Sequence, residues 1–167
     1  MSDLGGAVAV TRQHERRKLL WAGGTIFDIV LGGEHTGGSL ALLDQWGSQG
    51  DATPLHIHRR EAEVFYVLDG AVTAWVGDAV REMPAGSAVY LPAALPHAIR
   101  VDSPRARILT ITTPAGFSDF VREAGVVVEG EAPPIWEFDL QRIMTAAPRH
   151  DIEILGPPPG KHSAGGR

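Results

Sequence analysis

The sequence contains no cysteine. Disulfide bonds, thiolate metal sites and cysteine nucleophiles are therefore excluded. Positive charge is also scarce, because 15 lysines and arginines stand against 20 aspartates and glutamates, which gives a net charge of -5. A nucleic-acid-binding domain typically carries a basic patch, so we expect no nucleic-acid partner.

Long apolar runs are absent as well. No stretch approaches the roughly 20 apolar residues of a membrane-spanning helix, and the N-terminus lacks the charged-then-apolar layout of a signal peptide. We therefore expect no membrane association and a cytoplasmic location. The 167 residues, 44% of them hydrophobic and 21% charged, suit one globular domain with a real core.

Glycine and proline are frequent, with 20 and 12 copies. They divide the chain into short runs rich in β-branched and aromatic residues, a pattern typical of strands joined by turns. The runs cover residues 25–31, 39–46, 55–58, 63–68, 71–76, 88–91, 97–101 and 106–113. This spacing predicts an all-β sandwich or barrel over residues 23–115.

The pattern changes after Pro114, where apolar residues recur at helical spacing. Two such stripes predict one or two helices packed on the barrel, and they are Phe117, Phe120, Val121 and Ala124, then Leu140, Ile143, Met144 and Ala147. We assign residues 116–156 to this C-terminal extension, in which 150–155 could form one more strand. Residues 1–22 are interpreted as an N-terminal arm, with a first edge strand within residues 1–20 as the alternative. The Pro/Gly-rich residues 157–167 are expected to be a disordered tail.

One group of residues predicts chemistry. His56 and His58 lie two residues apart on a predicted strand, so both imidazoles point to the same face. Glu63 begins the next strand and can return beside them, and His97 begins a later strand. Three imidazoles and a carboxylate suit one divalent transition-metal ion: Ni, Co, Mn, Fe, Cu or Zn. Such an ion keeps coordination positions open for substrate, water or oxygen.

The segment around this group resembles the first cupin motif: Gly50, five residues, His56-x-His58, four residues, Glu63, six residues, Gly70. A second segment resembles the second cupin motif, with Gly86, five residues, Pro92 and then His97. It departs from the motif at Ala94, where glycine is usual, and at Val101, where asparagine is usual. The departures concern a turn and the end of a strand, and the histidine ligand is kept.

This resemblance implies a single cupin barrel, that is, a double-stranded β-helix or jelly roll, with His56, His58, Glu63 and His97 as metal ligands. Glu61 is a competing carboxylate that matches the motif spacing less well. Small cupins commonly dimerise, so the resemblance also implies a homodimer.

Further features, such as Glu63-Val-Phe-Tyr and Pro114-Ala-Gly-Phe-Ser-Asp-Phe, are similar to bacterial single-domain cupins of the quercetin 2,3-dioxygenase type. That similarity implies a dioxygenase that uses O₂ and a flavonol-like or enediol aromatic substrate, with Glu63 as both ligand and catalytic base. Two alternatives stay open. One is an oxygen-independent metal-dependent isomerase or cyclase of polyketide-like substrates, and the other is a ligand-binding cupin without catalysis.

The pocket wall is predicted from strand alternation. Phe65 and Val67 share the face of Glu63, and Ile99 shares the face of His97. We predict that these three residues and Trp75 form an apolar substrate pocket. The alternative is that they are ordinary barrel core.

Overall fold

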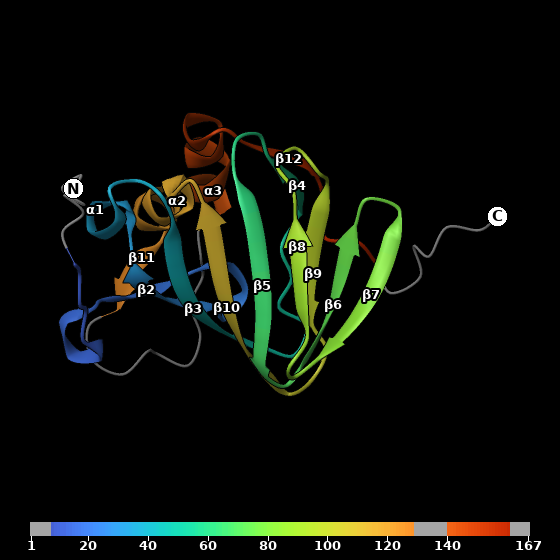
Figure 1. Cartoon of the computed structure of the whole chain (residues 1–167). Coiled ribbons are helices and arrows are strands. Elements are labelled where there is room, and N and C mark those ends of the chain that lie inside the picture. The colour runs from blue at the N-terminus through green and yellow to red at the C-terminus, as the bar shows by residue number, and fades with distance from the viewer. Residues whose placement is uncertain (1–7, 129–139, 161–167) are drawn as a thin grey trace, which may run out of the picture.

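The computed structural model describes residues 8–128 and 140–160. Within these ranges the chain forms two antiparallel sheets that face each other, with helices against one of them (Figure 1). This architecture confirms the predicted all-β class with C-terminal helices. Most of the tail predicted to be disordered lies outside the described residues.

The larger sheet has seven strands and carries Glu63. Its strands, in spatial order, are β11 (Val126–Val128), β1 (Lys18–Leu20), β2 (Ile26–Leu31), β3 (Ala41–Ser48), β10 (Arg105–Thr113), β5 (Ala62–Asp69) and β8 (Ala88–Leu91). Along β10 the residues alternate strictly, with Ala106, Ile108, Thr110 and Thr112 buried. The inner face of this sheet therefore forms one wall of the barrel.

The smaller sheet has five strands and carries the three histidines. Its order is β12 (Ile152–Gly156), β4 (Leu55–His58), β9 (His97–Val101), β6 (Ala71–Val76) and β7 (Ala79–Pro84). The C-terminal strand β12 pairs directly with β4, which places Ile152 opposite His58 and Ile154 opposite His56. The last described strand thus supports the strand that bears two predicted metal ligands.

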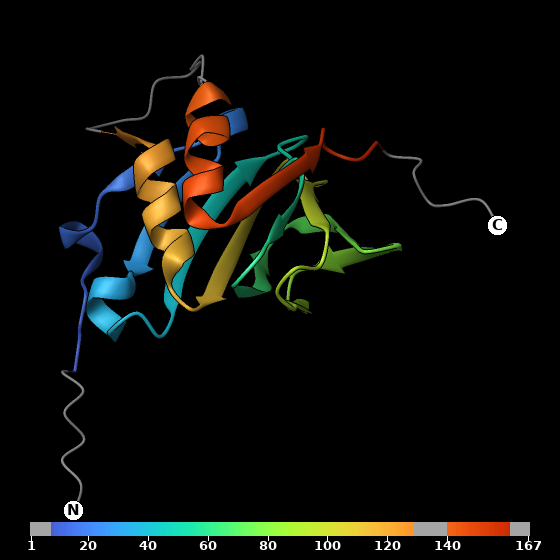
Figure 2. The same ribbon diagram turned by 90° about the horizontal axis from the view of Figure 1, so that it is seen from above.

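Three α-helices and three short 3-10 turns complete the described chain: α1 (Gly33–Thr36), α2 (Gly116–Ala124), α3 (Leu140–Ala146), η1 (Gln13–Glu15), η2 (Ala22–Gly24) and η3 (Ala147–His150). Helices α2 and α3 lie side by side against one part of the larger sheet (Figure 2). The smaller sheet packs against the neighbouring part of the larger sheet. None of the described helices has the length and apolar character needed to cross a membrane.

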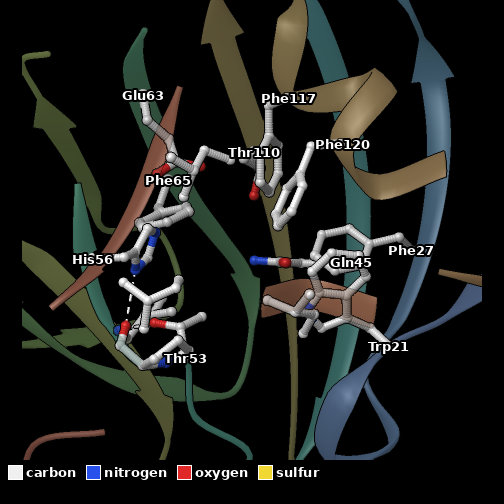
Figure 3. Close-up of a pocket in the computed structure, with 15 residues that line it drawn as sticks. Trp21, Phe27, Gln45, Thr53, His56, Glu63, Phe65, Thr110, Phe117 and Phe120 are labelled. Carbon is white, nitrogen blue, oxygen red and sulfur yellow. Dashed lines mark hydrogen bonds between the residues drawn. The ribbon is translucent and has the colours of Figure 1, made fainter. Parts of the chain in front are cut away.

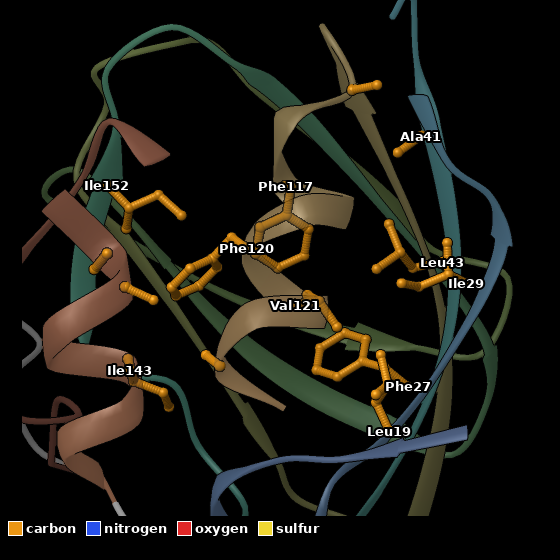
Figure 4. Close-up of a cluster of buried hydrophobic side chains, with 14 residues drawn as sticks. Leu19, Phe27, Ile29, Ala41, Leu43, Phe117, Phe120, Val121, Ile143 and Ile152 are labelled. Carbon is orange, nitrogen blue, oxygen red and sulfur yellow. The ribbon is translucent and has the colours of Figure 1, made fainter. Parts of the chain in front are cut away.

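The core consists of two clusters. One cluster lies between the two sheets and includes Phe65, Val67 and Ile99. The other fills the space between the larger sheet and the helices, where Phe117, Phe120 and other buried residues of α2 meet strands β2 and β3 and helix α3 (Figure 4). The apolar stripe predicted at residues 117–124 is this buried helical face. Burial of that face fixes α2 on the sheet.

The predicted strands correspond closely to the structure, and four of them (55–58, 71–76, 88–91 and 97–101) have the bounds of β4, β6, β8 and β9. The prediction missed β7 and β11, and it gave a first strand before residue 20, where β1 lies, only as an alternative to an arm. Strand β7 is an edge strand in which Met83 is the one buried residue, so its sequence lacks an apolar alternation. Strand β1 belongs to residues 1–22, interpreted as an arm, and pairs with both β2 and β11.

The turn before His97 contains the departure at Ala94. Ala94 has a φ of 61°, a left-handed conformation that glycine adopts without strain. Its N–H donates to the carbonyl oxygen of His58 at 2.7 Å, which ties this turn to strand β4. Ala94 therefore adopts the left-handed conformation that suits the glycine usual at this position of the motif, and it is strained in that conformation.

We predict that Ala94→Gly raises the free energy of unfolding by about 0.5–1 kcal/mol, since relief of left-handed strain outweighs the added freedom of the unfolded chain. The converse change, Gly70→Ala, should lower it by about 2 kcal/mol or more, because a Cβ at Gly70 would lie 2.2 Å from the carbonyl oxygen of Arg105. Urea denaturation measures both. A destabilised Ala94→Gly variant would contradict the account of this turn.

Candidate metal centre

Four predicted ligands meet between the two sheets. His56 and His58 project from β4 and His97 from β9, where His56 and His97 are register partners, while Glu63 projects from β5 of the opposite sheet. All four side chains are at most 9% exposed. One ligand atom from each lies within 4.8 Å of the others, close enough for a single ion to contact all four.

Hydrogen bonds on the far side of each ring orient the imidazoles. The Nδ1 atoms of His56 and His97 lie 2.8 Å from the carbonyl oxygens of Pro54 and Leu95. Because a carbonyl oxygen only accepts, Nδ1 carries the proton and Nε2 of the neutral ring keeps its lone pair. Metal-binding histidines are typically held this way.

The central atoms fit a cation. Nε2 of His58 is buried and has no hydrogen-bond partner within the described residues. Nε2 of His97 lies 3.1 Å from the carboxylate of Glu63, and Nε2 of His58 lies 3.9 Å from it. A buried nitrogen without a partner is costly, and a positive ion among these lone pairs and the carboxylate would satisfy all of them.

The electrostatics of the cluster keep His56 neutral and Glu63 ionised, which are the forms that bind metal. The raised pKa of His58 favours its protonated form instead, so metal binding there would displace a proton. Burial lowers the pKa of His56 to about 3, and the neighbouring His97 and His58 add to this effect. Burial opposes ionisation of His58 and of Glu63 as well, but their mutual attraction prevails, so the pKa of His58 is raised and that of Glu63 is lowered. Glu63 is therefore a carboxylate, the form that binds a cation.

Glu61 has a supporting position. Its carboxylate, 5% exposed, lies 3.0 Å from Nδ1 of His58 and accepts the backbone N–H of Phe117 at 2.6 Å. At Gly116 a Cβ would come within 3.0 Å of the same carboxylate. Glu61 thus connects a predicted ligand to the first turn of α2. The sequence suggested Glu61 as a rival ligand, whereas its oxygens face the outer nitrogen of His58.

A cavity opens beside His56 and Glu63. Aromatic side chains from distant parts of the chain line it, with Phe65 near the histidines and Trp21, Phe27, Phe117 and Phe120 on the other side (Figure 3). Isoleucines of β9, α3 and β12 complete the apolar wall. None of the fifteen described residues that line the cavity is a lysine or an arginine. Such a lining suits a neutral, planar guest.

The cavity continues toward the surface. A wider space of about 670 Å³ shares eight lining residues with it, including Trp21 and Ile143. It extends to Met144 of α3, to Leu155 of β12 and to Pro157 directly after that strand. Ligand pockets commonly have volumes of roughly 300–1,000 Å³. The wider space lies in this range, whereas the cavity that touches His56 and Glu63 has a volume of about 60 Å³. The C-terminal extension therefore forms one side of the route from the surface to the predicted ligands.

The four residues predicted to line the pocket have different positions. Phe65 and Ile99 line the cavity beside the histidines. Val67 is fully buried in the core between the sheets. Trp75 lies 4.9 Å from the guanidinium of Arg100 and is absent from the cavity lining. Strand alternation correctly predicted that Val67 faces the interior. Val67 lies two residues beyond Phe65 on β5, farther from Glu63, and there its side chain packs in the core instead of lining the cavity.

The sequence reasoning missed most of the aromatic wall. Trp21 precedes β2, and Phe117 and Phe120 belong to α2, which was predicted only as a packing helix. These residues reach the cavity because α2 packs across the inner face of β3. The relevant signal was the aromatic pair Phe117 and Phe120 on the buried stripe directly after the last barrel strand.

Comparisons with known proteins agree with this geometry. Residues 48–112 match the family model of the cupin domain. Over 156 residues the chain is 27% identical to quercetin 2,3-dioxygenase of Bacillus subtilis (strain 168), an alignment that covers 91% of this chain and 46% of that enzyme. The chain therefore spans about half the length of this relative.

Solved structures share the fold. KdgF from Halomonas sp. superposes with a TM-score of 0.59 at 19% identity, over 65% of this chain and 94% of that one. Oxalate decarboxylase from Bacillus subtilis gives a TM-score of 0.59 at 21% identity, over 71% of this chain and 33% of that one. The geometry and these matches together lead to one conclusion: the chain has the fold of the solved cupin structures, residues 48–112 match the cupin domain model, and the sequence is similar to a bacterial quercetin 2,3-dioxygenase.

Proposed function

We propose that this chain is a mononuclear metal-dependent dioxygenase that acts on a planar, flavonol-like aromatic substrate. In this proposal one divalent transition-metal ion is held by His56, His58, Glu63 and His97. The observation that carries it is the aromatic cavity, which reaches His56 and Glu63 and has no lysine or arginine among its described lining residues. The matched quercetin 2,3-dioxygenase supports the same substrate class.

The side chains that line the cavity favour a neutral aromatic substrate over a small anionic one. A small dianion such as oxalate, named for one structural relative, would need cationic side chains to offset the cost of burying its charge. The cavity offers instead five aromatic rings and four isoleucines, with Glu63 as its carboxylate. A planar aromatic molecule would gain from burial of its apolar surface against these side chains.

When bound, the ion would hold the oxygen atoms of the substrate close to O₂ and polarise both. Glu63 would accept the proton of the substrate hydroxyl, because its carboxylate is ionised and lines the cavity. Phe65 and Phe117 would flank the aromatic rings and exclude water from the reacting atoms. The Nδ1 hydrogen bonds of His56 and His97 would keep their rings in place during turnover.

The first prediction concerns the ligands. Purified protein should contain about one equivalent of a divalent transition metal, and His56→Ala and His97→Ala should each lose most of it, since removal of one of four ligands weakens the site strongly. Elemental analysis by mass spectrometry measures this. His14→Ala, at an exposed residue, is the control and should keep its metal. Full metal content in both ligand variants would refute the assignment.

The second prediction concerns Glu61. Glu61→Ala should weaken metal binding by about 10–100-fold, because Nδ1 of His58 loses the partner that orients the ring. Competition with a chelator of known affinity measures the change. Glu82→Ala removes an exposed carboxylate of β7 and is the matched control. Equal affinities in wild type and Glu61→Ala would show that Glu61 does not position the ligand.

The third prediction concerns the reaction. Metal-loaded protein should consume O₂ with quercetin, and Glu63→Gln should lower kcat/KM by at least about 100-fold, the lower range of general-base effects. An oxygen electrode measures uptake, and metal content is measured alongside. Substrate conversion under strict anoxia would instead support the isomerase or cyclase alternative. Binding without conversion in either atmosphere would support the non-catalytic alternative.

A further inference from the structure

Three buried side-chain polar atoms lack a hydrogen-bond partner within the described residues: Nε2 of His58, Oγ1 of Thr110 and Oγ1 of Thr112. They gather in one region, because Thr112 is the register partner of Glu63 and Thr110 that of Phe65. Buried polar atoms without partners are rare and costly, and each requires an explanation. The proposed ion accounts for His58 but not for the two hydroxyls.

Thr110 is the more informative of the two threonines because it lines the cavity. It is 1% exposed, and its register partners on the neighbouring strands are Leu43 and Phe65. Valine has nearly the same shape and would pack between these apolar side chains without burying an unpaired hydroxyl. Packing therefore does not explain why a hydroxyl group is present at this position.

Gln45 places a second polar group in the same wall. It is 8% exposed and lines both the cavity and its wider continuation. Figure 3 shows its amide projecting into the space between His56 and the aromatic side chains. An amide can donate to a carbonyl oxygen and accept from a hydroxyl group.

The sheet register places these groups on a line. Thr112 faces Glu63 and Thr110 faces Leu43, so Glu63, Thr110 and Gln45 follow a diagonal across β5, β10 and β3. Diagonal neighbours on adjacent strands are about 7–8 Å apart. The line therefore begins at a predicted metal ligand and crosses the apolar cavity wall with two hydrogen-bonding groups.

We propose that Thr110 and Gln45 form a polar subsite that binds hydroxyl or carbonyl substituents of the aromatic substrate, beyond the oxygens at the metal. The inference rests on the proposed function and narrows it to polyhydroxylated aromatic molecules. A molecule with oxygens along its length satisfies Glu63, Thr110 and Gln45 together. A molecule that lacks the outer oxygens leaves Thr110 unpaired.

The test compares two probes, quercetin and 3-hydroxyflavone, which share the metal-binding oxygens and differ in their other hydroxyl groups. Binding to metal-loaded protein under anoxia is followed by quenching of tryptophan fluorescence, since Trp21 lines the cavity. Wild type should bind quercetin at least about tenfold more tightly, and Thr110→Val or Gln45→Leu should reduce this preference by about tenfold. Affinity for 3-hydroxyflavone and metal content should stay at the wild-type values.

Thr73→Val is the matched control, because Thr73 is also buried in a sheet but its hydroxyl donates to Asp102 at 2.6 Å. It should lower the urea midpoint and leave the quercetin preference intact. Thr110→Val should leave the midpoint unchanged or raise it, since it removes an unpaired hydroxyl. A clearly lowered midpoint would mean that Thr110 has a structural role, and the subsite would be rejected.

The outcomes separate the two proposals. If wild type binds both flavonols and Thr110→Val keeps the full preference for quercetin, the subsite is wrong and the proposed function stands. If wild type binds neither flavonol, the proposed substrate class is wrong and the subsite fails with it.

Discussion

The structure depends on the burial of three imidazoles and one carboxylate between two sheets. Buried polar groups cost free energy unless they are paired, and here each imidazole is held at Nδ1 by Pro54, Leu95 or Glu61. These bonds direct the remaining nitrogens toward Glu63 on the opposite sheet. An ion at this point would join the two sheets, so metal binding and stability of the barrel would be coupled.

The C-terminal extension also supports the predicted metal centre and its cavity. Strand β12 pairs with β4, the N-terminus of α2 donates to Glu61, and α3 borders the outer part of the cavity. The cavity is therefore a product of the barrel together with the segment that follows it. The aromatic wall comes largely from residues outside the two segments that resemble the cupin motifs, namely Trp21, Phe27, Phe117 and Phe120.

The sequence predicted the parts of the molecule that follow local rules. The strands at residues 55–58 and 97–101 have the predicted bounds, and the four predicted ligands lie together in the structure. The missed features are non-local. Strand β7 lacks alternation because it is an exposed edge, and Trp21 and Phe120 reach the cavity only through tertiary packing. The contact between Glu61 and Nδ1 of His58 could not be predicted, because spacing alone does not show which histidine nitrogen a carboxylate faces.

In the proposed metal centre, one ion joins the two sheets at His56, His58, Glu63 and His97. The most direct measurement is a crystal structure of the metal-loaded protein, with anomalous diffraction recorded on both sides of the metal absorption edge. We expect a single strong anomalous peak with the three Nε2 atoms and a Glu63 oxygen at about 2.0–2.3 Å from it. A fully loaded crystal with no peak among these four side chains, or with its peak elsewhere, would contradict this expectation.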